Sequence, residues 1–183
     1  MSIQWIIFLA VTACLSYLSR ASLRVPRSHG FYRFFGWEAI LGLILLNVMV
    51  WFRDPYSWYQ VISWVCLIIS LLLAIHGFYL LHQLGKQNVK RDDAPLLEFE
   101  KTTHLITTGA YRYIRHPLYS SLVFLAIGVF FKSPSLPGGS LLLAAFLFLT
   151  ITARMEEIEN IHFFGPAYRE YMQKTKMFIP FIF

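Results

Sequence analysis

The chain has 183 residues, of which 57% are hydrophobic and 14% are charged, and its formal net charge is +6. This apolar content lies above the roughly 45–50% of soluble domains and excludes an ordinary soluble globular protein. It predicts an all-α, polytopic membrane protein that forms a single domain over residues 1–183. The two cysteines, Cys14 and Cys66, lie in apolar runs without CxxC spacing, so we expect free thiols that pack as small apolar groups.

Five apolar segments approach the length of about 20 residues that a helix needs to cross a bilayer. In chain order, the expected spans are 3–19, 36–52, 58–84, the segment after Pro117 to Phe131, and Gly139 to Ala153. The third span is longer than a bilayer requires, which predicts that it tilts or projects beyond the membrane. Turn signals at 54–55 and 133–139 separate neighbouring spans.

The basic residues are segregated by these five spans. Of the 16 Lys and Arg residues, only Arg53 and Lys132 fall on one side of the membrane. The positive-inside rule assigns the other, basic side to the cytoplasm, which predicts an external N-terminus and a cytoplasmic C-terminus. Topology and contact with anionic lipid account for the positive charge, so a nucleic-acid partner is not expected.

The segment GAYRYIRHPLY, residues 109–119, is unusually polar for a connection between two spans. Gly109 permits a positive φ or a close backbone approach, and Pro117 suits the first turn of a helix. Arg115 and His116 would then stand at a helix N-terminus, where backbone N–H groups favour an anion. The plainer interpretations are an interfacial histidine with satisfied hydrogen bonds and an arginine that contacts lipid phosphate.

The tail, residues 154–183, is the second polar segment next to a span end. If the fifth span continues as a helix, Arg154 and Glu157 share one face of it. A break at 163–166 precedes a short expected helix that carries Tyr168. Both polar segments are cytoplasmic in this topology, so we expect them to meet at the membrane surface. The alternative for the tail is an interfacial amphipathic helix with snorkelling charges.

Other polar positions give weaker signals. The first third of the chain shows no catalytic pattern, and we expect His29 and Glu38 to be interfacial or capping residues. Asn47 is expected to form an interhelical hydrogen bond. His76 and His82 are six residues apart, so we do not expect them to form a metal site.

The two polar segments carry a resemblance to a known family. The sequence resembles the isoprenylcysteine carboxyl methyltransferases and the related phospholipid N-methyltransferases. The family pattern has an Arg-His-Pro-x-Tyr stretch, then two spans, an Arg-x-Glu-Glu stretch and Phe-Gly-x-x-Tyr-x-x-Tyr. Here these elements are residues 115–119, 154–157 and 164–171, followed by Pro180. The resemblance covers roughly 82–183 and implies a methyltransferase core in 85–183, which follows the three N-terminal spans expected in 1–84.

The resemblance implies S-adenosylmethionine as the methyl donor, bound at the cytoplasmic surface by both polar segments, and a lipophilic acceptor that arrives from the bilayer. Carboxylates suit the ribose and α-amino groups of this donor, whereas His116 or Arg115 suits its α-carboxylate. Tyrosines can donate hydrogen bonds or face the sulfonium. The expected catalytic residues are Arg115, Arg154 and Glu157. The expected cofactor-binding residues are His104, Leu105, Thr107, Gly109, Tyr111, His116, Pro117, Tyr119, Glu156, Glu157 and Tyr168.

The chemistry of the acceptor stays open at this point. A carboxylate acceptor needs no general base, because it is ionised near neutral pH, and an arginine is enough to orient it. An amine needs a Glu or His to take its proton, and a thiol needs a base or a lowered pKa. We expect carboxyl O-methylation of a prenylcysteine-like acceptor. The alternatives are N- or S-methylation of a lipid amine or small thiol, or a non-catalytic protein that binds lipid or a partner. Residues 85–104 are interpreted as a lid, an acceptor-entry element or a solvated loop, and the oligomeric state is undetermined.

Overall fold

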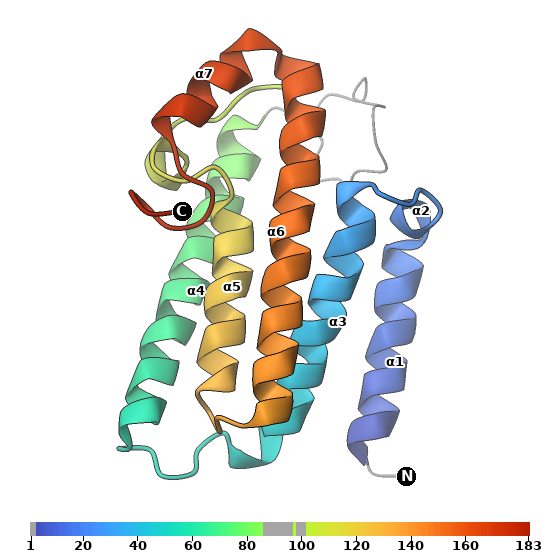
Figure 1. Ribbon diagram of the computed structural model, residues 1–183, viewed down its shortest axis with the longest axis vertical. Coiled ribbons are helices and arrows are strands. Elements are labelled where there is room, and N and C mark those ends of the chain that lie inside the picture. Colours follow the sequence, from blue (N-terminus) through green and yellow to red (C-terminus); the bar gives the residue numbers. More distant parts are fainter. Residues whose placement is uncertain (1–2, 86–96, 98–101) are drawn as a thin grey trace.

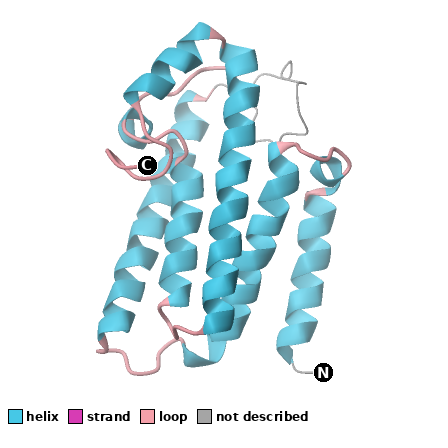
Figure 2. Ribbon diagram, viewed as in Figure 1, coloured by secondary structure: helices cyan, strands magenta, loops and turns pink. Residues whose placement is uncertain are grey.

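The computed structural model describes residues 3–85, 97 and 102–183, and this part of the chain consists of helices joined by loops and turns (Figure 2). Most of segment 85–104, interpreted above as a lid, an acceptor-entry element or a solvated loop, lies outside these described residues. In chain order, the elements are α1 Ile3–Leu18, α2 Arg20–Leu23, α3 His29–Asn47, η1 Val48–Val50, α4 Trp58–Leu84, η3 Gly109–Arg112, α5 Pro117–Phe130, α6 Leu136–Phe164 and α7 Pro166–Lys174.

Five apolar helices run side by side in a bundle (Figure 1). Three of them, His29–Val50, α4 and α6, are long and apolar enough to cross a membrane. The apolar helices α1 and α5 are shorter, with 16 and 14 residues. The predicted all-α, polytopic membrane fold is therefore confirmed.

Two helix boundaries differ from the predicted spans. The helix of the second span begins at His29 and not at residue 36, because the Ser28 side chain caps it by accepting the Phe31 N–H at 3.2 Å. The helix of the fifth span continues past Ala153 to Phe164, as the placement of Arg154 and Glu157 on one helix required. Its last turns rise beyond the ends of the neighbouring helices (Figure 1).

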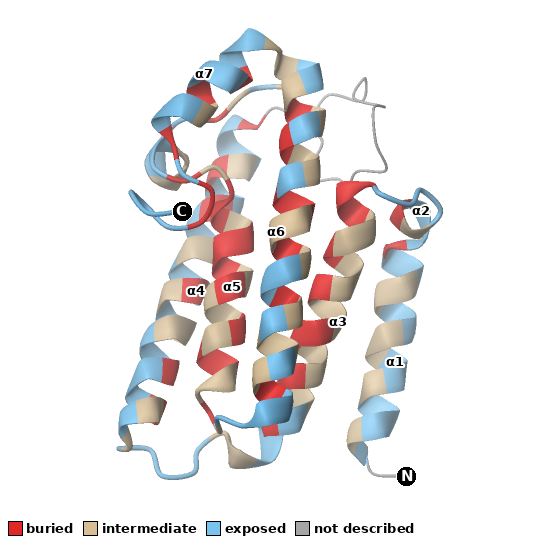
Figure 3. Cartoon of the chain, in the orientation of Figure 1, coloured by how far each residue is buried: buried red, intermediate tan, exposed pale blue. Residues whose placement is uncertain are grey.

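The helices form a layer in which α3 packs against α6, α6 against α5, and α5 against α4. Helix α1 packs against α3 at the edge and has no buried residue. Figure 3 shows the buried positions concentrated on α3, α5 and α6. The hydrophobic core consists of Ala39, Ile40, Leu43, Tyr119, Val123, Ala126, Val129, Ala145, Leu149, Ala153, Met177 and Phe178.

Helix α4 turns its large apolar side chains outward and its small or polar side chains toward α5. Ile68, Leu71 and Ile75 are exposed, whereas Ser63, Ser70 and Gly77 are buried. Ser70 Oγ donates to the Ser121 carbonyl at 2.7 Å, and a Cβ on Gly77 would lie 2.8 Å from Leu118. This arrangement is typical of membrane helices, which bring small residues together and face lipid with apolar ones.

The two ends of the bundle have different character. One end carries α7, residues 102–116 and the C-terminal segment, and the chain begins at the other end (Figure 1). Arg53 and Lys132 lie in the connections at that other end, which agrees with the predicted segregation of basic residues. Near it, Asn47 Nδ2 donates to the Val129 carbonyl at 3.1 Å, so the predicted interhelical hydrogen bond is confirmed.

Candidate functional site

The two polar segments meet at one end of the bundle, as the sequence predicts. Ile114 and Lys176 form a parallel bridge, in which the Arg115 N–H donates to the Lys176 carbonyl at 2.8 Å. The Tyr171 hydroxyl on α7 donates to the Tyr111 carbonyl at 2.6 Å. These bonds attach the tail to the loop before α5 and hold both beside α6.

The turn at Gly109 brings this loop against α4. Gly109 has a φ of +59°, and a Cβ there would lie 2.5 Å from the His76 ring nitrogen. The next residue, Ala110, donates its N–H to His76 Nε2 at 3.2 Å. Both uses of glycine that the sequence suggested therefore occur here, and Pro117 is the first residue of α5 as predicted.

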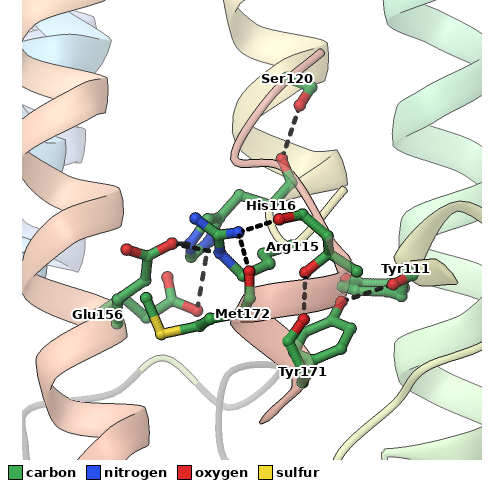
Figure 4. Close-up of polar contacts among 9 residues, drawn as sticks. Tyr111, Arg115, His116, Ser120, Glu156, Tyr171 and Met172 are labelled. Carbon is green, nitrogen blue, oxygen red and sulfur yellow. Dashed lines mark hydrogen bonds and ion pairs between the residues drawn. The ribbon is translucent and has the colours of Figure 1, made fainter. Parts of the chain in front are cut away.

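Arg115 and Glu157 form a largely buried ion pair, with 2.6 Å between Nε and Oε1 and side-chain exposures of 10% and 8%. Arg115 Nη1 also donates to the carbonyls of Thr175, at 2.5 Å, and Met172, at 3.4 Å (Figure 4). His116 Nε2 lies 3.3 Å from the same Glu157 oxygen. Arg115 and Glu157 thus connect three elements, namely the loop, α6 and the tail.

A cavity of about 270 Å³ lies beside this ion pair, close to the lower end of the roughly 300–1,000 Å³ of small-molecule pockets. Glu156, Asn160 and Tyr168 line it from α6 and α7, and α4 and α5 contribute mainly apolar side chains such as Phe78 and Leu122. The predicted site residues that line it are His104, Leu105, Tyr111, Arg115, His116, Tyr119, Glu156 and Tyr168.

The remaining predicted site residues lie outside this lining. Three of them support residues that form the cavity wall. Gly109 makes the turn against α4, Pro117 starts α5, and Glu157 forms the ion pair with Arg115. Thr107 and Arg154 are exposed, and neither is among the described residues that line the cavity. Their roles in binding and catalysis stay predictions.

The described lining of the cavity combines the carboxylate of Glu156 with neutral phenols. Glu156 Oε1 lies 4.0 Å from His116 Nδ1, and its side chain keeps 27% exposure. Burial raises the pKa of Tyr111, Tyr168 and Tyr171 well above the ordinary value for phenols. These three hydroxyl groups therefore stay protonated at physiological pH and can donate hydrogen bonds.

Sequence reasoning missed the contribution of α3. Arg33 is 1% exposed and lines the cavity together with Trp37, with the guanidinium carbon 4.9 Å from the Trp37 ring centroid. The sequence feature that could have revealed this residue is an arginine inside an apolar helix. It went unnoticed because the second span was expected to begin at residue 36, which left Arg33 in a connection.

Neither His29 nor Glu38 is a helix cap, because Ser28 caps α3, so that part of the expectation is wrong. His29 is completely buried, and its Nδ1 lies 2.6 Å from Glu159 Oε2 on α6. Glu38 accepts a hydrogen bond from Thr12 Oγ1 of α1 at 2.7 Å. Both residues join helices to one another, a role that depends on partners far away in the sequence.

Comparison with known proteins identifies the family. Residues 58–167, more than half of the chain, match the model of the phospholipid methyltransferase family. The chain therefore belongs to this family, and the resemblance seen in the sequence is confirmed. The matched region begins with α4 and ends at the start of α7, so it contains the loop, α5 and α6 but leaves out α3.

Curated relatives include methyltransferases with different acceptors. The chain is 37% identical over 87 residues, 46% of its length, to human protein-S-isoprenylcysteine O-methyltransferase, and 30% identical over 129 residues, 68% of its length, to the Saccharomyces cerevisiae protein of the same name. It is 28% identical over 121 residues, 64% of its length, to methanethiol S-methyltransferase 1 of Bradyrhizobium diazoefficiens. These alignments span 30%, 53% and 39% of the relatives' own lengths.

Proposed function

We propose that the protein is a membrane-embedded methyltransferase that uses S-adenosylmethionine and acts on a lipophilic acceptor, by carboxyl O-methylation of a prenylcysteine-like group. The observation that carries this proposal is the cavity at the junction of the two polar segments, lined by Tyr111, His116, Glu156 and Tyr168. Family membership and the names of the relatives support it.

The residues present fit such a donor. Glu156 offers a carboxylate for the donor's amino group or ribose hydroxyls, and the backbone beside Leu105 with neighbouring aromatic rings offers an apolar place for adenine. His116 stands next to the first turn of α5, where it and the backbone N–H groups suit the donor's carboxylate. Neutral tyrosine rings can face a sulfonium through their π-electrons.

The bound donor would supply a methyl group. The acceptor oxygen bonds to the methyl carbon as the carbon–sulfur bond breaks, and the electron pair of the broken bond stays on sulfur. No proton moves, because the acceptor carboxylate is already ionised. The protein's own contribution is alignment of the two reactants and exclusion of water. The Arg115–Glu157 pair serves alignment, because it fixes the loop and the tail that form the cavity wall.

Two other acceptors remain as competing proposals. The S. cerevisiae and human relatives are named for O-methylation of protein S-isoprenylcysteine, and the Bradyrhizobium relative is named for S-methylation of methanethiol. The family description adds phospholipids, which would make the acceptor an amine. A protein that binds lipid or a partner without catalysis is the alternative from another class.

We also propose that the cavity faces the cytoplasm and that the N-terminus lies outside. The support is the positive-inside rule applied to the two ends of the bundle. Basic residues such as Arg24, Arg112 and Arg169 belong to the cavity end, whereas Arg53 and Lys132 belong to the other. Reaction of a cysteine introduced at Ser2 with an impermeant thiol reagent in intact cells, in a Cys14→Ser, Cys66→Ser background, would support this orientation.

The direct test is calorimetric titration of S-adenosylhomocysteine into the detergent-solubilised protein. Binding by the wild type and its loss in Glu156→Ala or Glu157→Ala would support the donor site. Acceptor assays with a prenylcysteine acid, a phospholipid amine and a thiol would then decide the reaction. Failure of well-folded wild-type protein to bind would overturn the proposed methyltransferase and favour the non-catalytic alternative.

A further inference from the structure

Three glutamates lie close together on α6, and the fold turns each of them in a different direction. Glu156 lines the cavity, and Glu157 pairs with Arg115. The third, Glu159, turns to α3: its Oε2 lies 2.6 Å from His29 Nδ1, and its Oε1 accepts the His29 backbone N–H at 3.4 Å. The proposed function gives a role to the first two glutamates and none to the third.

Glu159 contacts the first residue of α3 through both of its oxygens. His29 is completely buried. An ionised carboxylate only accepts hydrogen bonds, so Nδ1 of His29 is the donor, and this bond forms whether the ring is neutral or protonated. A negative charge is also favourable at a helix N-terminus, and α3 begins at His29. The contact therefore joins the cavity end of α3 firmly to α6.

Farther from the cavity end, α3 lies on α6 through apolar contacts. Phe35 stacks on Phe148 with 5.4 Å between the ring centroids, and a Cβ on Gly36 would lie 3.3 Å from the Leu149 side chain. The hydrophobic effect is non-directional, whereas a hydrogen bond requires a particular distance and angle. The bonds to Glu159 therefore constrain the rotation of α3 about its axis more closely than the apolar contacts do.

The rotation of α3 decides which side chains this helix presents to the cavity. His29, Arg33 and Trp37 follow one another at intervals of four residues, so they lie along one face of the helix. Arg33 and Trp37 line the cavity. Attachment of His29 to Glu159 therefore holds this face in the direction in which Trp37 forms part of the cavity wall.

The residues that line the cavity fall into two groups. Those that we propose to contact the methyl donor belong to the loop before α5, to α6 and to α7. Trp37 comes from α3, and α4 and α5 contribute mainly apolar side chains such as Phe78 and Leu122. This second group suits the hydrocarbon part of an acceptor. The relatives are named for different acceptors, and α3 lies outside the matched region 58–167, so contacts specific to one acceptor can be made there.

We propose that Glu159 is a positioning residue for the methyl acceptor: by holding His29 it orients α3 so that Trp37 packs against the hydrocarbon part of the acceptor. This proposal rests on the proposed methyltransferase function and deepens it by assigning acceptor binding to α3. It holds for a carboxylate, an amine or a thiol, because it concerns the apolar part that such acceptors share. Glu159 and His29 themselves touch neither reactant.

The first test replaces Glu159 and measures the two reactants separately. The acceptor is whichever of N-acetyl-S-farnesylcysteine, farnesyl thiol and lysophosphatidylethanolamine the wild type methylates. We expect Glu159→Ala to raise the acceptor KM about 10–150-fold, the equivalent of losing the burial of one large apolar group. The kcat and the Kd of S-adenosylhomocysteine should stay within about threefold, because the apolar contact is the same before and during methyl transfer. Glu159→Gln keeps an oxygen that accepts the Nδ1 proton, so it should restore most of the acceptor affinity.

Replacement of the partner should give the same result. His29→Leu removes the ring donor and should raise the acceptor KM as Glu159→Ala does, again with little change in the Kd of S-adenosylhomocysteine. The matched control is His162→Leu, which removes an exposed histidine near the end of α6 and should leave both values within about threefold of the wild type.

A double variant tests whether Glu159 acts through Trp37. Trp37→Ala alone should raise the acceptor KM by a similar factor, and Glu159→Ala combined with Trp37→Ala should raise it little further, whereas independent effects would multiply. Factors that multiply would overturn the positioning role. So would an unchanged acceptor KM in Glu159→Ala, or an equal loss of donor and acceptor affinity, which would indicate general damage to the fold.

The Trp37 variants keep the proposal testable if Glu159→Ala and His29→Leu do not fold. Trp37 is half-buried, and Trp37→Phe keeps an aromatic wall, so the acceptor KM should rise from wild type to Trp37→Phe to Trp37→Ala. An unchanged KM in Trp37→Ala would overturn the proposal. A wild type that binds S-adenosylhomocysteine but methylates none of the three acceptors would overturn the acceptor site and leave the donor site intact. Absence of S-adenosylhomocysteine binding by the wild type would be a failure of the proposed function itself.

Discussion

Among the described residues, the basic side chains of Arg33 and Lys132 are both buried to 1% exposure, at opposite ends of the bundle. Lys132 is surrounded by protein groups: its Nζ donates to Gln60 Oε1 at 3.0 Å and lies 3.5 Å from the Trp64 ring centroid. Arg33 lies on Trp37 in a similar way but also faces a cavity. Burial of a charge therefore does not by itself separate structural from functional residues, and we expect the space beside Arg33 to make the difference.

The same contrast holds for the two ends as a whole. At the Lys132 end, short connections join neighbouring helices, and Gln60 Nε2 closes that end by donating to the carbonyls of Arg53 and Lys132, at 3.0 and 3.3 Å. At the cavity end, segments distant in sequence must be docked onto α6, and the Arg115–Glu157 pair does this. Substitutions should therefore affect stability at both ends but ligand binding at only one.

The largest effect is expected from breaking the docking pair. Glu157→Ala leaves Arg115 buried without its carboxylate, which costs about 3–5 kcal/mol in similar cases. We expect a large drop in the thermal unfolding midpoint of the detergent-solubilised protein and loss of S-adenosylhomocysteine binding. The double variant Arg115→Met, Glu157→Leu should regain much of the stability without regaining binding. A wild-type midpoint in Glu157→Ala would contradict the docking role.

The next largest effect is expected on ligand affinity, with little change in the stability of the fold. Glu156→Gln keeps the shape of the side chain but removes the charge that faces the cavity. We expect the Kd of S-adenosylhomocysteine, measured by calorimetry, to rise about 10–150-fold, because hydrogen bonds to charged groups contribute about 1.5–3 kcal/mol. Glu170→Gln, at an exposed position of α7 paired with Lys174, is the matched control. Similar Kd values for both variants would argue against a donor site at Glu156.

The outline of this molecule could be predicted from sequence because its signals are local. Apolar length predicted the five apolar helices, and the proline of the Arg-His-Pro stretch predicted the start of α5. The five-span topology put the loop and the tail on the same side and so predicted that they meet, which the Ile114–Lys176 bridge confirms. Each of these features depends on residues close together in the chain or on a family pattern.

The rest of the site could not be predicted, because it depends on contacts between distant residues. His29 meets Glu159 across 130 positions, and nothing near His29 indicates this partner. The place of Arg33 inside a helix was not predicted, because the Ser28 cap starts α3 before the apolar run begins. Glu156 and Glu157 are adjacent and equivalent in the sequence, and only the fold directs one to the cavity and the other to Arg115.

A moderate effect on stability alone is expected at the other end of the bundle. Lys132→Met removes the donor to Gln60 Oε1, and leaving a buried acceptor unsatisfied costs about 1–3 kcal/mol. The thermal unfolding midpoint should fall, while the Kd of S-adenosylhomocysteine stays within threefold of the wild type. A clear change in that Kd would mean that the two ends are coupled, and the contrast between Arg33 and Lys132 would fail.

The smallest effect should come from Tyr171→Phe, which deletes the single hydrogen bond from α7 to the Tyr111 carbonyl. A neutral hydrogen bond contributes about 0.5–1.5 kcal/mol, so the loss of stability should be of that size near neutral pH. Burial raises the pKa of Tyr171, so above about pH 10 the unfolded chain releases this proton while the folded protein retains it. Rising pH therefore costs the wild type stability that Tyr171→Phe does not lose, and the two unfolding midpoints should converge in alkaline buffer. A gap that widens above pH 10 would show that the hydroxyl ionises in the folded state, and the tail would then be attached to the loop by other groups.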